Sequence, residues 1–108
     1  MDVDSLTLEE VISLVKKSKD ENIQILPREK NEEFMFANAI TQCDAKDFIR
    51  SLSASDYIKG PVLDIDPNRK HYLWIFKKYG FEKYCYIKLK VINGGKVVIV
   101  VSFHEDEW

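Results

Sequence analysis

The last third of the chain constrains its fold most strongly, because two strand-like runs there are joined by a glycine-rich turn. In the run Tyr84–Ile92, apolar side chains alternate with tyrosines and lysines, a period of two that indicates a half-buried β-strand. Residues 93–95, Asn-Gly-Gly, tolerate positive φ and predict that Val97–His104 folds back as a hairpin. One face of the first strand then carries phenols and ammonium groups, which suit a polyanion with bases such as RNA or single-stranded DNA.

The composition predicts one compact domain, residues 1–108, because 108 residues with 45% hydrophobic content can bury a core. No apolar stretch is long enough to span a membrane, and the acidic N-terminus lacks the apolar segment of a secretory signal. Cys43 and Cys85 lack the spacing of a zinc site, so we expect two reduced thiols in a cytoplasmic protein.

The charges are unevenly distributed around a net charge of −2, which by itself argues weakly against nucleic acid. Residues 1–58 hold seven Lys or Arg and twelve Asp or Glu, whereas residues 59–96 hold nine and three. A basic sheet joined to an acidic helical half can bind phosphate locally despite an acidic average. Exposed lysines are also ordinary on strands, where they prevent edge pairing, and charge alone favours that simpler explanation.

Helices followed by an antiparallel meander are expected along the chain. Thr7 and Glu10 form a capping box for the first helix, and Asp44 is expected to cap the third. Residues 34–36 of the second helix are expected to face inward. The helices are predicted at residues 8–19, 31–39 and 45–52, and a short strand at 23–26.

The segment 59–70 holds two prolines and a glycine and predicts a surface loop. A strand is expected at 71–76, followed by a turn at 77–80, and the final hairpin completes at least three antiparallel strands. The predicted fold class is therefore α+β, an antiparallel sheet with N-terminal helices packed on one face.

No phosphate-binding loop, GxSxG, HExxH or EF-hand motif is present, which removes most enzymes that motifs define. Asp64 and Asp66 lie in the proline-containing segment without a supporting His or Glu, so turn formation explains them better than metal binding. Of the two histidines, His71 and His104, the second closes the last strand, where we expect it to be accessible and to titrate near neutral pH.

The length of the final turn decides which face of the sheet His104 occupies. A three-residue loop, 93–95, places Tyr86 on the same face as Ser102 and Tyr84 on the same face as His104. A strict two-residue turn places Tyr86 and His104 on opposite faces unless a bulge intervenes. Three consecutive Asn or Gly residues favour the longer loop, which forms a Tyr–Lys–His cluster.

Metal-free RNA cleavage needs the parts that this cluster contains. A base takes the 2′-OH proton, a cation holds the phosphate, and an acid protonates the leaving 5′-oxygen. A tyrosine beside a lysine or histidine serves in either proton role, depending on how its pKa is shifted. Lys59 and Arg69 can approach the cluster from the preceding loop.

Four segments, in order, resemble the MqsR family of bacterial toxins: LSASDYIKGP at 52–61, HYLWIF at 71–76, YIKL at 86–89 and VSFH at 101–104. The similarity extends over residues 44–105. That family belongs to type II toxin–antitoxin systems and shares the RelE-like fold. The resemblance implies a sequence-selective mRNA endoribonuclease, an mRNA interferase, that needs no metal or other cofactor and is neutralised by a cognate antitoxin protein.

The resemblance also implies catalytic roles for three residues. Lys59 follows the Leu-Ser-x-Ser-Asp-Tyr segment, Tyr86 begins the Tyr-aliphatic-Lys strand, and His104 stands where the family often has lysine. A glutamine that can follow the strand tryptophan in the family is Ile75 here, a departure that bears on substrate positioning or on the cleavage sequence preference. Further candidate contacts to phosphate or base are Arg69, His71 and Lys88.

Two other interpretations stay open. One is a non-nuclease relative of RelE- or ParE-like toxins, and the other is a protein-binding α+β domain whose basic sheet meets an acidic partner. A nuclease is expected to place Lys59, Tyr86 and His104 within reach of one phosphate. A scattered arrangement of these three favours the non-nuclease toxin.

Overall fold

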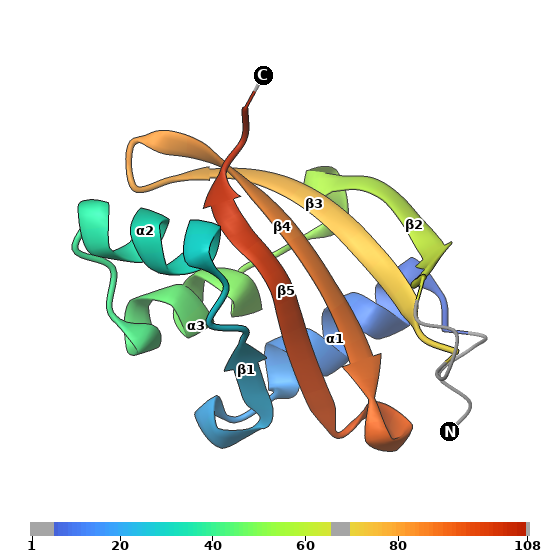
Figure 1. The fold of residues 1–108 in the computed structure, drawn as a ribbon. Helices are drawn as coiled ribbons and strands as arrows, with labels where there is room; N and C mark the ends of the chain where they lie inside the picture. The colour runs from blue at the N-terminus through green and yellow to red at the C-terminus, as the bar shows by residue number, and fades with distance from the viewer. Residues whose placement is uncertain (1–5, 66–69, 108) are drawn as a thin grey trace.

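The computed structural model describes residues 6–65 and 70–107, which form a twisted five-stranded sheet covered by helices on one side (Figure 1). The helices are α1 (Leu8–Lys17), α2 (Glu29–Ala37) and α3 (Gln42–Arg50). The strands are β1 (Ile23–Ile25), β2 (Tyr57–Leu63), β3 (Tyr72–Gly80), β4 (Lys83–Ile92) and β5 (Val97–Glu105). The strand order is β1-β5-β4-β3-β2, and only the β1–β5 pair is parallel. The predicted α+β class, with a mostly antiparallel sheet, is confirmed.

Strand β4 has the predicted alternation, and this alternation separates the two faces of the sheet. The side chains that face the helices are all buried: Cys85, Ile87, Leu89 and Val91. The opposite face, called the open face below, carries Tyr84, Tyr86, Lys88 and Lys90. Helix α1 crosses behind the sheet in Figure 1, so the viewer looks onto the open face.

Phe103 of β5 is the centre of an aromatic cluster on the helix-covered side. Its ring is fully buried and meets the Phe34 ring of α2 edge-on, with 5.3 Å between centroids. Phe48 of α3 and Phe81 lie at 6.0 and 6.2 Å from the same ring. Burying one phenylalanine contributes about 1.5–3 kcal/mol, so the orientation of Phe103 matters for stability.

Helix α1 begins with the predicted capping box, in which the Thr7 hydroxyl accepts from the Glu10 N–H at 3.2 Å. The prediction for α3 was wrong, because its N-cap is Thr41 rather than Asp44. Asp44 is the third helical residue and completes a second capping box, its carboxylate accepting from the Thr41 N–H at 3.1 Å. That bond holds the pKa of Asp44 below its ordinary value. The helix therefore begins three residues before the predicted 45–52.

Helix α2 begins and ends two residues before the predicted 31–39. Phe34 and Met35 face inward as expected, but Phe36 is 91% exposed. Three consecutive residues cannot share one face of a helix with 3.6 residues per turn, which is why that part of the prediction was wrong. The earlier start brings Asn31 into the first turn, where its side chain is buried.

The predicted loop 59–70 is wrong over its first half, where the chain forms the edge strand β2. Proline removes a ladder N–H, but an edge strand tolerates it at irregular positions. Pro61 lies in such a place, since the pairing of β2 with β3 shifts register between Lys59 and Val62. The other half of the predicted loop includes residues 66–69, which lie outside the described residues.

The predicted turn 77–80 is also wrong, because β3 continues through Gly80. The chain turns instead at Phe81 and Glu82, which have φ of 54° and 65° and connect the paired residues Gly80 and Lys83. Positive φ at both central positions is what a two-residue hairpin turn of type I′ requires. Gly80 serves packing, since a Cβ there would overlap the Phe48 ring.

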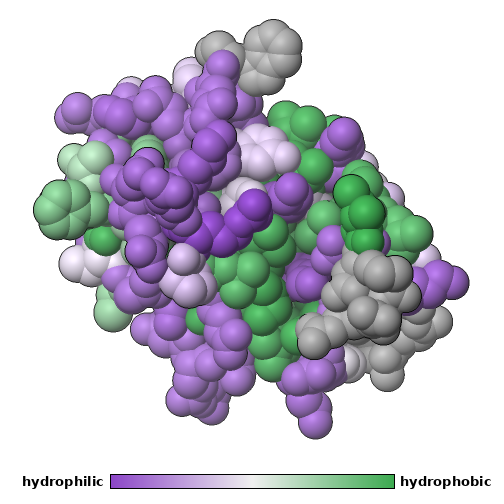
Figure 2. Space-filling view, in the orientation of Figure 1, coloured by the Kyte–Doolittle hydropathy of each residue, from purple (hydrophilic) through white to green (hydrophobic). Residues whose placement is uncertain are grey.

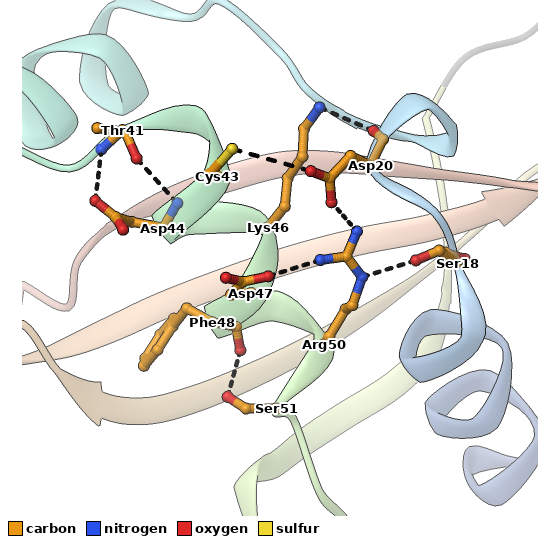
Figure 3. A network of polar contacts seen from close by, with 10 residues as sticks. All are labelled: Ser18, Asp20, Thr41, Cys43, Asp44, Lys46, Asp47, Phe48, Arg50 and Ser51. Carbon is orange, nitrogen blue, oxygen red and sulfur yellow. Dashed lines mark hydrogen bonds and ion pairs between the residues drawn. The ribbon is translucent and has the colours of Figure 1, made fainter.

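A polar network fastens the end of α1 to α3 (Figure 3). Arg50 donates from Nε to the Ser18 carbonyl at 2.7 Å and from Nη1 to Asp47 at 2.9 Å, and its Nη2 pairs with Asp20. Lys46 donates to the Asp20 carbonyl at 2.9 Å. The Arg50 hydrogen bond lowers the pKa of Asp20. The network has intramolecular partners for its charges, so it supports the fold.

Both cysteines are free thiols, Cys43 exposed and Cys85 buried. Burial raises the pKa of the Cys85 thiol to about 11. In the described part of the chain, no helix has the length and apolar character needed to cross a membrane.

Candidate functional site

The β4–β5 hairpin places His104 on the open face, directly opposite Tyr86. The predicted shared face is therefore confirmed, but the predicted three-residue loop is wrong. Ile92 pairs with Val97, so four residues separate the strands. An even-numbered loop, like the strict two-residue turn, would by itself turn Tyr86 and His104 to opposite faces.

A β-bulge in β5 returns His104 to the same face of the sheet as Tyr86. Leu89 pairs with Val100, whereas the next residue of β4, Lys88, pairs with Ser102. Val101 is thus the extra residue, and it inverts the alternation of every residue of β5 that follows it. The expected Tyr–Lys–His cluster therefore forms, but through a bulge and not through a three-residue loop.

The rings of Tyr86 and His104 are stacked, with 5.4 Å between their centroids and 21° between their planes. His104 Nδ1 lies 2.9 Å from the Glu105 carbonyl oxygen. A carbonyl only accepts, so Nδ1 carries the hydrogen of this bond. The neutral imidazole then has its lone pair on Nε2, which is the nitrogen that can take up or return a proton.

A groove of about 430 Å³ opens beside this pair, between the open face and the start of α2. Its lining residues are Arg28, Glu29, Lys30, Asn31, Tyr86, Lys88, Ser102 and His104. In the space-filling view, hydrophilic residues dominate the α2 side of the open face, and apolar ones gather over the lower part of β4 and β5 (Figure 2). The groove therefore combines a tyrosine, a histidine and three cationic side chains with a single carboxylate.

Arg28 is a groove residue that the sequence analysis missed. It precedes α2 as its N-cap, and its Nη1 donates to the Val101 carbonyl at 3.4 Å. Within residues 6–65 and 70–107, neither Arg28 nor Lys88 forms an ion pair. Nothing in the local sequence around Arg28 signals this position, because it depends on the parallel pairing of β1 with β5.

Lys59 is exposed on β2 and does not line the groove. It pairs with Ile75, which in turn pairs with Lys88, so the two lysines share one cross-strand row. Two strand spacings separate them, roughly 10 Å between backbones. The structure therefore brings Tyr86, His104 and Lys88 together and leaves Lys59 on the far side of β3.

His71 lies at the other end of the open face, in a cluster that we call the Lys90 cluster: Asp64, His71 and Lys90. The Lys90 ammonium is 3.1 Å from the Asp64 carboxylate and 3.0 Å from His71 Nδ1. It is only 14% exposed, and its hydrogen bond holds the pKa of Asp64 below its ordinary value. Because an ammonium only donates, His71 Nδ1 is an acceptor. Asp64 also donates its backbone N–H to the His71 carbonyl at 2.8 Å, which closes the β2–β3 connection.

Two residues that the sequence analysis named, Arg69 and Asp66, lie outside the described residues. Among the residues that are described, no group of three or more His, Cys, Asp and Glu side chains is placed to hold a metal ion.

The fold and the groove define a small α+β protein whose helix-free sheet face carries a stacked tyrosine–histidine pair and cationic side chains. The family model described as "motility quorum-sensing regulator, toxin of MqsA" matches residues 5–105, and the chain belongs to this MqsR toxin family. It is therefore a toxin of a toxin–antitoxin system, with an antitoxin as its partner. Comparisons with curated proteins and with solved structures gave no match.

Proposed function

We propose that this toxin is a metal-independent, sequence-selective endoribonuclease that cleaves mRNA and is neutralised by its cognate antitoxin. The observation that carries the proposal is the stacked Tyr86–His104 pair beside a cationic groove. The pair offers two groups that exchange protons, and Lys88 offers a charge for a phosphate. In this proposal, residues 1–108 act as one toxin domain in the cytoplasm, where the mRNA is.

The proposed reaction forms one P–O bond and breaks another. The ribose 2′-oxygen attacks the adjacent phosphorus while a base removes its proton, and the 5′-oxygen leaves with a proton from an acid. The products are a 2′,3′-cyclic phosphate and a 5′-hydroxyl. We assign the two proton transfers to His104 Nε2 and the Tyr86 hydroxyl, since general acid–base groups must lie within hydrogen-bond reach of the reacting oxygens.

Cationic side chains stabilise the charge that develops on the phosphate oxygens. We assign this role to Lys88, because it lies two residues from Tyr86 on the same face. We propose that Lys59 reaches the same phosphate from the far side of Ile75, since a lysine carries its charge on a long flexible stem. Arg69 and His71 remain candidates for contacts to flanking nucleotides.

The charge distribution makes binding local rather than long-range. A net charge of −2 gives little attraction to RNA beyond a Debye length. The groove must therefore bind through direct contacts with phosphate, and we expect affinity to fall with salt.

The test is incubation of the purified, antitoxin-free protein with a defined mRNA in EDTA, followed by mapping of the cleavage ends. The variants are His104→Ala and Tyr86→Phe, with Tyr79→Phe as a matched control that removes another hydroxyl from the same face. Discrete cuts that persist in EDTA, weaken in the two site variants and remain in the control support the proposal. Intact RNA with folded protein, also in the presence of ribosomes, would favour a non-nuclease toxin.

A further inference from the structure

The amide side chain of Asn31 is buried against the bulge of β5, and only 1% of the residue is exposed. Its Nδ2 donates to the Leu26 carbonyl at 3.0 Å and to the Val101 carbonyl at 3.1 Å. Its Oδ1 accepts from the Phe103 N–H at 2.9 Å. One side chain thus provides hydrogen-bond partners for the carbonyl of the bulge residue Val101 and for the N–H of Phe103, two residues later.

The Asn31 side chain lies along the edge of β5, where a neighbouring strand would otherwise pair. Strand β1 pairs with β5 from Ile23 to Ile25, and the Leu26 N–H still donates to the Val100 carbonyl at 3.0 Å. Beyond that point the chain enters α2, and among the described residues no strand pairs with the outer edge of β5. The Asn31 amide presents a donor and an acceptor side by side, as a peptide group does, and so continues the ladder along the bulge.

The bulge decides which residue of β5 faces the groove. Without it, the pairing of Ile92 with Val97 would continue unchanged and bring Phe103 opposite Tyr86. Phe103 would then lie on the open face, and His104 would point toward the helices. A buried N–H or carbonyl left without a partner is costly, so removal of the Asn31 amide disfavours the bulged arrangement.

We propose that Asn31 is a positioning residue of the ribonuclease site, holding the Val101 bulge so that His104 stacks on Tyr86. The inference rests on the proposed function for its effect on cleavage. Asn31 also lines the groove, but its three hydrogen bonds all go to the protein backbone. Its effect on the reaction is therefore exerted through His104.

The first experiment compares Asn31→Leu with a control at the C-cap of the same helix, Asn38→Leu. The Asn38 amide also donates to a backbone carbonyl, that of Phe34 at 2.8 Å, but it touches no residue of β5 through a hydrogen bond. In Asn31→Leu we expect the nuclear Overhauser contact between the Tyr86 and His104 rings to disappear. Cleavage should fall to the level of His104→Ala, roughly 10²-fold or more below wild type. The Asn38→Leu protein should keep both.

The second experiment is a rescue by deletion of Val101. Removing the extra residue restores a regular ladder in which His104 remains opposite Tyr86, so the amide is no longer needed to hold a bulge. We expect the Asn31→Leu protein without Val101 to regain the ring contact and to cleave within about 10-fold of the Val101 deletion alone, a gap that corresponds to about 1.4 kcal/mol. A loss of packing alone would not be repaired by shortening β5.

Retention of the ring contact and of cleavage in Asn31→Leu would overturn the proposal, and so would failure of the rescue in a folded protein. Should Asn31→Leu alone not fold, the two proteins that lack Val101 decide, since a large difference between them contradicts the assigned role. If the wild type does not cut RNA, the proposed function fails. The ring contact then still reports whether Asn31 positions His104.

Discussion

The two ends of the open face of β4 hold similar side chains in opposite circumstances. At one end, Lys88 lies near Tyr86 and His104 beside the groove. At the other, Lys90 lies with His71 and Asp64 in the Lys90 cluster. Each end has one histidine and one lysine, and the two lysines lie two residues apart on the same face of β4.

The difference lies in the partners. In the Lys90 cluster, a carboxylate neutralises the ammonium and His71 Nδ1 is an acceptor. At the groove, His104 Nδ1 donates to a backbone carbonyl, and Lys88 forms no ion pair with any described residue. The two histidines therefore use Nδ1 in opposite roles, as a donor in His104 and as an acceptor in His71. Residue type alone does not make a site; a group can act on a ligand only where the fold has left its bonding capacity unused.

The largest expected difference between the two ends is in catalysis. We expect His104→Ala to lower kcat by roughly 10²–10⁴-fold, the usual range for a general acid or base. His71→Ala should change kcat by less than about 3-fold, since its Nδ1 is already bonded within the protein, with any larger effect on KM. Single-turnover cleavage of an RNA oligonucleotide gives the loss of rate in both variants. Equal losses would remove the distinction between the two ends.

The second difference is in stability, where we expect the larger effect at the Lys90 end. Lys90→Met removes the partner of Asp64 and His71, and we expect a loss of about 1–3 kcal/mol in the free energy of unfolding. Lys88→Met should change it by less than about 0.5 kcal/mol, as is usual for a surface substitution away from such a network. Urea denaturation of both variants gives the comparison. A larger loss in Lys88→Met would show that Lys88 supports the fold.

A smaller effect is expected in RNA binding. Lys88→Gln should weaken binding several-fold and reduce the slope of log K against log salt by about 0.7, the value for one phosphate contact to a single strand. Lys90→Gln should leave the slope unchanged, because Asp64 already neutralises that charge. Fluorescence anisotropy in the His104→Ala background, where the RNA stays intact, measures the slopes. A change in slope for Lys90→Gln would place RNA at both ends.

The smallest effect is the acid sensitivity of the Lys90 cluster. The Lys90 hydrogen bond lowers the pKa of Asp64 from its ordinary value of 3.8. The resulting stabilisation is present above pH 3.8 and is lost as pH falls through the lowered pKa. We expect Asp64→Asn to be less stable than wild type near neutral pH by about 0.5–1 kcal/mol, with the gap closing below about pH 4. Thermal unfolding between pH 2 and 7 tests this, and a constant gap would exclude Asp64 as its source.

Local patterns predicted the parts of the fold that depend on neighbouring residues. The alternation along β4 and the Thr7–Glu10 capping box both appear in the structure. The failures concern segments whose conformation depends on a distant partner. Residues 57–63 look like a loop because of Gly60 and Pro61, yet pairing with β3 makes them an edge strand.

The same division applies to the candidate site. Tyr86, Lys88 and His104 come from one hairpin, and their shared face was predicted from alternation across a three-residue loop, but the structure reaches it through a four-residue loop and the Val101 bulge. Arg28 and Asn31 approach from 70 or more residues away in the chain, through the parallel β1–β5 pairing. No spacing rule within a single sequence connects an asparagine in a helix with a bulge in the last strand.

The edges of the sheet show a further consequence of this arrangement. On one side β1 has only three residues, and the Asn31 amide covers β5 just beyond them. On the other side, β2 has two register shifts and a proline. Long, regular edges with unpaired backbone groups invite strand addition and aggregation. Along the described strands, neither edge of this toxin presents the long, regular row of unpaired backbone groups that strand addition uses.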